Sequence, residues 1–127
     1  MIDHLSTYAT NYERTRDFYN AALEPLGIGL VTEFTASEGS ERVCAFGSGQ
    51  LGQLWVIESR IAYTPRHLAF RAASRRHVDE FHTAALAAGG TDNGAPGLRP
   101  HYHAGYYGAF VIDPDGNNIE AVFHGNP

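Results

Sequence analysis

The chain has 127 residues, of which 43% are hydrophobic and 18% are charged, and its formal net charge is −5. This length and composition are typical of one globular domain, so we expect a single domain over residues 1–127. The acidic balance argues against nucleic acid or an anionic membrane as the main partner. The chain has no apolar run of about 18 residues, its first residues lack the pattern of a signal peptide, and its only cysteine, Cys44, cannot form an internal disulfide. These observations favour a cytoplasmic protein.

The sequence repeats itself at a fixed distance. When it is shifted by 63 residues, 8 of the 24 pairs from His4/His67 to Gly27/Gly90 are identical, whereas ordinary amino-acid usage gives about one or two identities by chance. Matched alanines and leucines are expected of any two amphipathic units, but a matched histidine at the start of each unit is not required for packing. The pattern therefore predicts two related units that each open with a histidine.

The first unit, about residues 2–60, is predicted to form a strand, a helix and three further strands. Alternating apolar and polar residues over 4–9 indicate the first strand. Asn11 is a suitable helix N-cap, and Gly27 is suited to the left-handed conformation that ends a helix. The later extended runs are Gly29–Thr35, Arg42–Phe46 and Gln53–Glu58, with a small loop expected at Ser37–Ser40.

The second unit, about residues 65–125, repeats this order. A strand over 67–72 is followed by a helix that Ser74 can cap and Gly89 can end. We expect Thr91–Gly105, which is rich in glycine and proline, to be an ordered loop. Strands are predicted at Tyr106–Ile112 and Asn118–His124, joined by a turn at Asp113-Pro114-Asp115-Gly116.

Side chains along a strand alternate between its two faces, so one row should face the helix and the other the opposite side of the sheet. The rows predicted to point away from the helices are His4, Ser6 and Tyr8; Gln53, Trp55 and Ile57; His67, Ala69 and Arg71; and Asn118, Glu120, Val122 and His124. Both repeat-opening histidines and one carboxylate therefore share a face.

Two imidazoles and one carboxylate are a suitable ligand set for a divalent metal ion. Such a set leaves coordination positions open for water, substrate or dioxygen, and Fe(II), Mn(II), Ni(II) and Zn(II) are all compatible with it. The alternative for each histidine alone is an ordinary hydrogen-bonded residue. The combination of His4, His67 and Glu120 favours the metal site.

The chain resembles the vicinal oxygen chelate superfamily, the group of glyoxalase I, bleomycin resistance proteins and extradiol dioxygenases. The motifs that carry the resemblance are Ile2-Asp3-His4-Leu5, Arg16-Asp17-Phe18-Tyr19, His67-Leu68-Ala69-Phe70 and Asp113-Pro114-Asp115-Gly116-Asn117-Asn118-Ile119-Glu120. The resemblance implies an α+β fold of two tandem βαβββ modules that form a curved, barrel-like mixed sheet with the helices outside. It also implies metal ligands at His4, His67 and Glu120, and a homodimer in which the ligands can come from one chain or from two.

The chain departs from the glyoxalase I pattern at one position. Members of that type resemble a four-ligand site, in which a further carboxylate or similar group lies on the last strand of the first module. On that strand Glu58 has the parity of the helix-facing row, and Trp55 cannot coordinate a metal ion. Three ligands resemble the dioxygenase pattern more closely.

Other residues are candidates to complete a site. His103, Tyr106 and Tyr107 are candidate proton-handling residues, because imidazole titrates near neutral pH and a phenol can orient or protonate an oxygen. Arg71 is suited to hold a substrate carboxylate or phosphate. The expected substrate pocket contains Tyr8, Gln53, Trp55, Arg71 and Asn118.

Two functions of different classes follow from these residues. The first is a metal-dependent enzyme, dioxygenase-like or lyase/isomerase-like, that acts on a small oxygen-bearing organic molecule. The second is a metal-free drug-binding protein of the bleomycin-resistance type, in which Tyr8, Trp55, Tyr106 and Phe110 would be stacking surfaces. The ligand trio favours the enzyme, because a pure binding protein has no need to combine those three residues.

Overall fold

The computed structural model describes residues 2–36 and 41–126, so the loop predicted at residues 37–40 lies outside the described residues. The elements of the first module are β1 (Leu5–Ala9), α1 (Tyr12–Ala22), a short 3-10 helix (Glu24–Leu26), β2 (Gly29–Thr35), β3 (Arg42–Gly47) and β4 (Leu54–Glu58). Those of the second are β5 (His67–Arg71), α2 (Arg75–Ala87), β6 (Thr91–Leu98), β7 (Tyr106–Ile112) and β8 (Asn118–His124). The α+β class and the paired βαβββ modules are confirmed.

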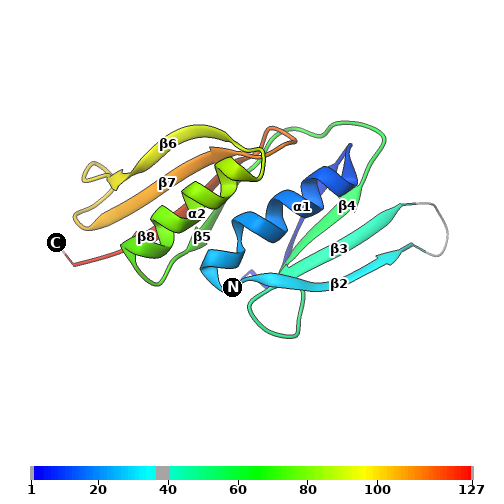
Figure 1. Ribbon diagram of the computed structural model, residues 1–127, viewed down its shortest axis with the longest axis horizontal. Helices are drawn as coiled ribbons and strands as arrows, with labels where there is room; N and C mark the ends of the chain where they lie inside the picture. Colours follow the sequence, from blue (N-terminus) through cyan, green and yellow to red (C-terminus); the bar gives the residue numbers. More distant parts are fainter. Residues whose placement is uncertain (1, 37–40, 127) are drawn as a thin grey trace.

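Each module contains a four-stranded mixed sheet, in the orders β1-β4-β3-β2 and β5-β8-β7-β6. The first strand of each module runs parallel to the last, and the other neighbours are antiparallel. Figure 1 shows α1 and α2 next to each other near the middle of the molecule, with one sheet extending to either side. Within one chain the described strands form two separate mixed sheets, which do not close into a barrel.

The helix N-termini form where the sequence predicts them, whereas α1 ends at Ala22, before the end predicted at Gly27. The Asn11 side chain accepts a hydrogen bond from the backbone N–H of Arg14, and the Ser74 side chain accepts one from His77. Gly27 ends the short 3-10 helix with φ 76°, in the left-handed region that favours glycine.

The core lies between the helices and the sheets. Fully buried aromatic side chains of the helices, among them Phe18, Tyr19 and Phe81, pack in one cluster with Phe46, Val56 and Ile119 of the strands. The only cysteine, Cys44, is also buried. Because this row of each strand is used for packing, the opposite row is left available for chemistry.

The segment Thr91–Gly105 differs from its prediction as a loop, because Thr91–Leu98 forms strand β6 at the edge of the second sheet. Its pairing with β7 is interrupted by two register shifts, between Asp92 and Gly94 and between Gly94 and Gly97. Glycine and proline signal a loop in most sequences, but an edge strand with bulges accommodates them.

The Asp113–Gly116 turn forms as predicted and also joins the modules. Asp113, 4% exposed, accepts hydrogen bonds from the backbone N–H groups of Asp115 and Asn117 and from the Tyr19 hydroxyl of α1. Asp115 accepts one from the Thr15 hydroxyl of the same helix. The turn of the second module is thus bonded to the helix of the first. No helix among the described residues is long and apolar enough to cross a membrane.

Candidate functional site

The face of the second sheet opposite α2 brings His67 and Glu120 together. They lie on the parallel neighbours β5 and β8, and His67 Nε2 is 3.2 Å from Glu120 Oε1. Glu120 is only 2% exposed, although its strand neighbours Ile119 and Ala121 point the other way into the core. Among the described residues its only ion-pair partner is His67, so it is a buried carboxylate with no arginine beside it.

The protonation of His67 follows from its second nitrogen. His67 Nδ1 lies 2.9 Å from the backbone carbonyl oxygen of Asn118. Because a carbonyl oxygen only accepts, Nδ1 carries a hydrogen, and Nε2 of the neutral ring holds a lone pair. That lone pair faces the Glu120 carboxylate. Two electron-rich atoms at this distance require a cation between them or a second proton on the ring.

Tyr106 of β7 binds the other oxygen of the same carboxylate. Its hydroxyl donates a hydrogen bond to Glu120 Oε2. Burial, together with the hydrogen bond to Glu120, raises the pKa of Tyr106 well above its ordinary value, so the phenol stays protonated and acts as a donor. Tyr106 therefore holds Glu120 in place.

Gly108 provides the space for this contact. A Cβ at position 108 would lie 3.1 Å from Glu120 Oε2 and 3.2 Å from Tyr106 Cε1. Any other residue would press on both partners of the hydrogen bond. The site therefore depends on glycine at position 108, because glycine has no side chain to fill this space.

A shallow pocket of about 530 Å³ surrounds the pair. It is lined by His67, Tyr102, Tyr106, Phe110, Asn118 and Glu120. The Tyr102 and Tyr106 rings meet edge to face at 4.9 Å, and Phe110 stacks on His67 at 6.3 Å. Tyr102 is a residue that sequence reasoning missed; the aromatic density of 99–107 was its only signal.

His4 lies apart from this pair. It precedes β1, its side chain is 57% exposed, and its Nδ1 is 2.6 Å from Asp3 Oδ1. In residues 2–36 and 41–126 of a single chain, no three histidine, cysteine, aspartate or glutamate side chains come close enough to hold one metal ion. One chain thus brings together two members of the predicted trio.

Among the described residues of the first module, no copy of the His67–Glu120 pair is found. Leu5 pairs with Leu54 as Leu68 pairs with Ile119, so Trp55 occupies on β4 the place of Glu120 on β8. Glu58, the carboxylate nearest along that strand, is bound to Arg42 at 2.8 Å.

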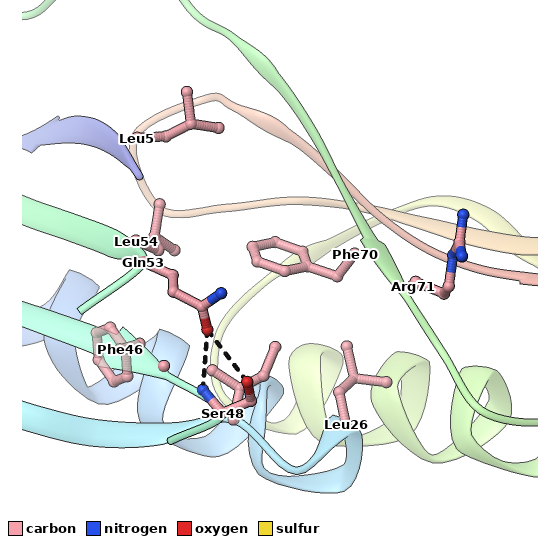
Figure 2. Close-up of a pocket in the computed structure, with 10 residues that line it drawn as sticks. Leu5, Leu26, Phe46, Ser48, Gln53, Leu54, Phe70 and Arg71 are labelled. Atoms are coloured by element: carbon pink, nitrogen blue, oxygen red, sulfur yellow. Dashed lines mark hydrogen bonds between the residues drawn. The ribbon is translucent and has the colours of Figure 1, made fainter. Parts of the chain in front are cut away.

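Two predicted pocket residues, Gln53 and Arg71, line a different cavity, of about 340 Å³, between the modules. Figure 2 shows Gln53 bonded to Ser48 at one end of it and Arg71 at the far end, with Phe70 between them. The other lining residues are Leu5, Leu26, Ile28, Phe46, Gly47 and Leu54. This cavity is mostly apolar and is separate from the His67–Glu120 pocket.

The remaining candidates are placed as follows. Tyr8 stacks on Tyr63 at 4.3 Å. Tyr107 points to the helix side, where its hydroxyl donates to Asp79 of α2 at 2.7 Å. His103 faces His124 rather than Glu120, with 2.9 Å between His103 Nε2 and His124 Nδ1.

Comparisons with known proteins agree with this fold. The model of the Glyoxalase/Bleomycin resistance protein/Dioxygenase superfamily matches residues 1–121. The chain is 28% identical to a glyoxalase/bleomycin resistance protein from Albidiferax ferrireducens T118, covering 98% of this chain and 97% of that one with a TM-score of 0.72. No curated protein matches it.

Two glyoxalase I structures share the fold at lower identity. A glyoxalase I variant from Zea mays is 19% identical with a TM-score of 0.74, covering 95% of this chain and 46% of that one. The trypanothione-dependent glyoxalase I of Leishmania major is 19% identical with a TM-score of 0.64, covering 98% and 86%. The chain therefore belongs to the Glyoxalase/Bleomycin resistance protein/Dioxygenase superfamily.

Proposed function

We propose that the protein is a metal-dependent enzyme, dioxygenase-like or lyase/isomerase-like, that acts on a small oxygen-bearing organic molecule. The observation that carries the proposal is the 3.2 Å contact between His67 Nε2 and the buried Glu120 carboxylate, with His67 Nδ1 already bound to a backbone carbonyl. A divalent cation held by both atoms satisfies this arrangement and gives the buried carboxylate a counter-charge.

The donor atoms fit such a cation. An imidazole nitrogen and a carboxylate oxygen suit Fe(II), Mn(II), Ni(II) and Zn(II). Metal-binding histidines usually donate their second N–H to a carbonyl or carboxylate, as His67 does to Asn118. The Tyr106 hydroxyl plays the corresponding role for Glu120.

The third ligand of the proposal is His4 from a second copy of the chain. Within one chain His4 does not join the pair. Both β1, which His4 precedes, and β5, which His67 opens, are edge strands of their sheets in the described residues. Open edges are normally covered, and a homodimer covers them while supplying the missing imidazole.

When bound, the cation would act as a Lewis acid toward substrate oxygens. The chain's own residues would bind and orient the substrate. The rings of Tyr102, Tyr106 and Phe110 give the pocket aromatic walls that suit a flat molecule. Because Asn93 Nδ2 donates to Asn118 Oδ1, Asn118 has its own amide N–H groups left to bind a substrate oxygen.

Metal analysis tests the proposal. Wild type reconstituted separately with Fe(II), Mn(II), Ni(II) and Zn(II) is expected to retain about one equivalent more of at least one metal than His67→Ala and Glu120→Gln do. His101→Ala, an exposed histidine outside the pair, is the control. A difference of less than about one-tenth of an equivalent between wild type and these two variants would favour a protonated His67 and a metal-free binding protein.

Mixing two inactive variants tests whether the site is shared. His4→Ala keeps the His67–Glu120 pair, and Glu120→Gln keeps His4. If each site takes residues from two chains, random pairing of the two variants restores one intact site in half of the dimers, about a quarter of wild-type metal content. No recovery after unfolding and refolding together would place all ligands in one chain. Aerobic assays with catechols and 2-oxoaldehydes then separate the oxygenase and lyase/isomerase reactions.

A further inference from the structure

A second pair of imidazoles lies at the end of the same sheet. His103 belongs to the segment between β6 and β7, and His124 is the last residue of β8. Their rings are nearly parallel, with 21° between the planes and 5.1 Å between the centroids, and His103 Nε2 is 2.9 Å from His124 Nδ1. Both side chains are exposed.

The state of His103 follows from its neighbour. Its Nδ1 lies 2.8 Å from the carbonyl oxygen of Ala104, which only accepts, so Nδ1 carries the hydrogen and Nε2 holds a lone pair. His124 Nδ1 then supplies the one proton between the rings. If His124 moves that proton to its own Nε2, two lone pairs are directed at a common point.

We propose that His103 and His124 form a separate site for a borderline divalent cation such as Ni²⁺, Cu²⁺ or Zn²⁺, which takes the place of the proton between the two rings. Imidazole nitrogen suits these cations, and water would complete the coordination. The backbone carbonyl on His103 Nδ1 is the kind of outer contact that fixes the tautomer and orientation of a metal-binding histidine.

The backbone holds the two imidazoles in position before any cation binds. The N–H of Gly125, next to His124, donates to the carbonyl of Gly105 at 2.9 Å. Gly105 has φ +83°, and a Cβ there would lie 2.3 Å from Gly125 O, so only glycine allows this approach. The segment that carries His103 is thereby fixed to the end of β8.

Tyr106 separates this pair from the first site. Its ring meets His103 edge to face at 5.2 Å and His124 at 5.4 Å, while its hydroxyl binds Glu120. The two sites share no ligand. The proposal is therefore independent of the proposed function, since it uses neither His67, Glu120 nor His4.

Calorimetric titration with Ni²⁺ tests the proposal on the wild-type protein and on single variants. Wild type is expected to bind one equivalent, in addition to any metal at the first site, that His103→Ala and His124→Ala bind about a hundredfold more weakly, because two preplaced ligands act together. His101→Ala, from the same segment, is the matched control and should bind like wild type. Glu120→Gln should also keep this equivalent, even if it abolishes binding at the first site.

The nitrogen couplings in the Cu²⁺ electron paramagnetic resonance spectrum provide a second readout. Two imidazole nitrogens are expected in Glu120→Gln, and one fewer in Glu120→Gln combined with His124→Gln, which keeps a polar side chain and guards against misfolding. Unchanged Ni²⁺ affinity in both His103→Ala and His124→Ala would overturn the proposal. Loss of this equivalent in Glu120→Gln would also overturn it, because the two sites would then be one.

Discussion

Trp55 in the first sheet and Glu120 in the second occupy equivalent positions. The two modules differ most clearly in these two side chains. The two sheets have the same strand order, their first and last strands pair in the same register, and their opening histidines are 63 residues apart. On the helix side both modules bury similar apolar rows. On the opposite side, the first presents an indole with Phe34 edge-on at 6.3 Å, and the second presents a buried carboxylate.

The carboxylates of the two modules also differ in their partners. In the first module Glu33 is bound by Arg16, and Glu58 by Arg42. In the second, Glu120 has only a histidine and a tyrosine. Arginine-paired carboxylates are neutralised and stabilise the fold, whereas Glu120 remains available to a cation. The two modules therefore share their packing and differ on their open faces.

Removing the tyrosine hydroxyl should have the largest effect on stability. Tyr106→Phe leaves one oxygen of the buried Glu120 carboxylate without its donor, which should cost about 2 kcal/mol of unfolding free energy. Tyr107→Phe is the control on the neighbouring residue, because its hydroxyl bonds to Asp79 on the exposed helix surface. Urea denaturation measures both, and equal losses would mean that Glu120 is not held by Tyr106.

Giving the first module the missing carboxylate should strengthen metal binding. Trp55→Glu places a carboxylate at the equivalent of Glu120, and if the modules face one cation in the dimer, affinity should rise about tenfold, or 1.4 kcal/mol. Trp55→Gln is the neutral control of the same shape. Competition titration with a chelator measures the difference, and equal affinities of the two variants would mean that a side chain at position 55 does not reach the cation.

Filling the space at position 108 should have a smaller effect. The Cβ of Gly108→Ala would push on Glu120 Oε2 and Tyr106 Cε1, so we expect a loss of about 1 kcal/mol in unfolding free energy. Gly29→Ala in the first sheet is the matched control, because nothing lies within 4 Å of its added Cβ. A loss as large in Gly29→Ala would trace the effect to glycine in general.

Acid should weaken the first module slightly. The Tyr12 hydroxyl and Arg16 lower the pKa of Glu33, and Arg42 lowers the pKa of Glu58. A lowered folded-state pKa gives stability that is complete above the ordinary value near 4.5 and is lost as the pH falls through the folded-state pKa.

Arg42→Ala should therefore reduce the dependence of unfolding free energy on pH below about 4.5. His82→Ala is the counterpart in the second module, where His82 lowers the pKa of Asp92. Urea melts at pH 7 and at pH 4 measure both variants. An unchanged acid dependence in Arg42→Ala would show that Glu58 gains nothing from its arginine.

Much of the fold follows from local sequence signals. Strand alternation, the Asn11 and Ser74 caps and the Asp113–Gly116 turn all predict what the structure contains. β6 does not follow, because Gly94, Pro96 and Gly97 are typical of loops, and only the neighbouring β7 makes them a strand. Secondary-structure propensity depends on the residues of the segment itself, whereas an edge strand also depends on the strand with which it pairs.

The site was partly predictable for a similar reason. The alternation of side chains along β5 and β8 is enough to place His67 and Glu120 on one face of the sheet, since alternation can be read from the sequence without knowledge of distant contacts. The hold of Tyr106 on Glu120 depends on the empty space at Gly108, and Tyr102 reaches the pocket from a connecting segment. Neither the role of Gly108 nor that of Tyr102 follows from the alternation of side chains along a strand.

The bonds from Asp113 and Asp115 to α1 have a consequence for how the two halves can be separated. The turn that supplies these carboxylates belongs to the later half, and Tyr19 and Thr15, which they accept from, belong to the earlier one. A fragment ending between the halves would leave the Tyr19 hydroxyl in the interior without an acceptor. Recombination of either half with an unrelated partner would need to carry this aspartate–tyrosine contact with it.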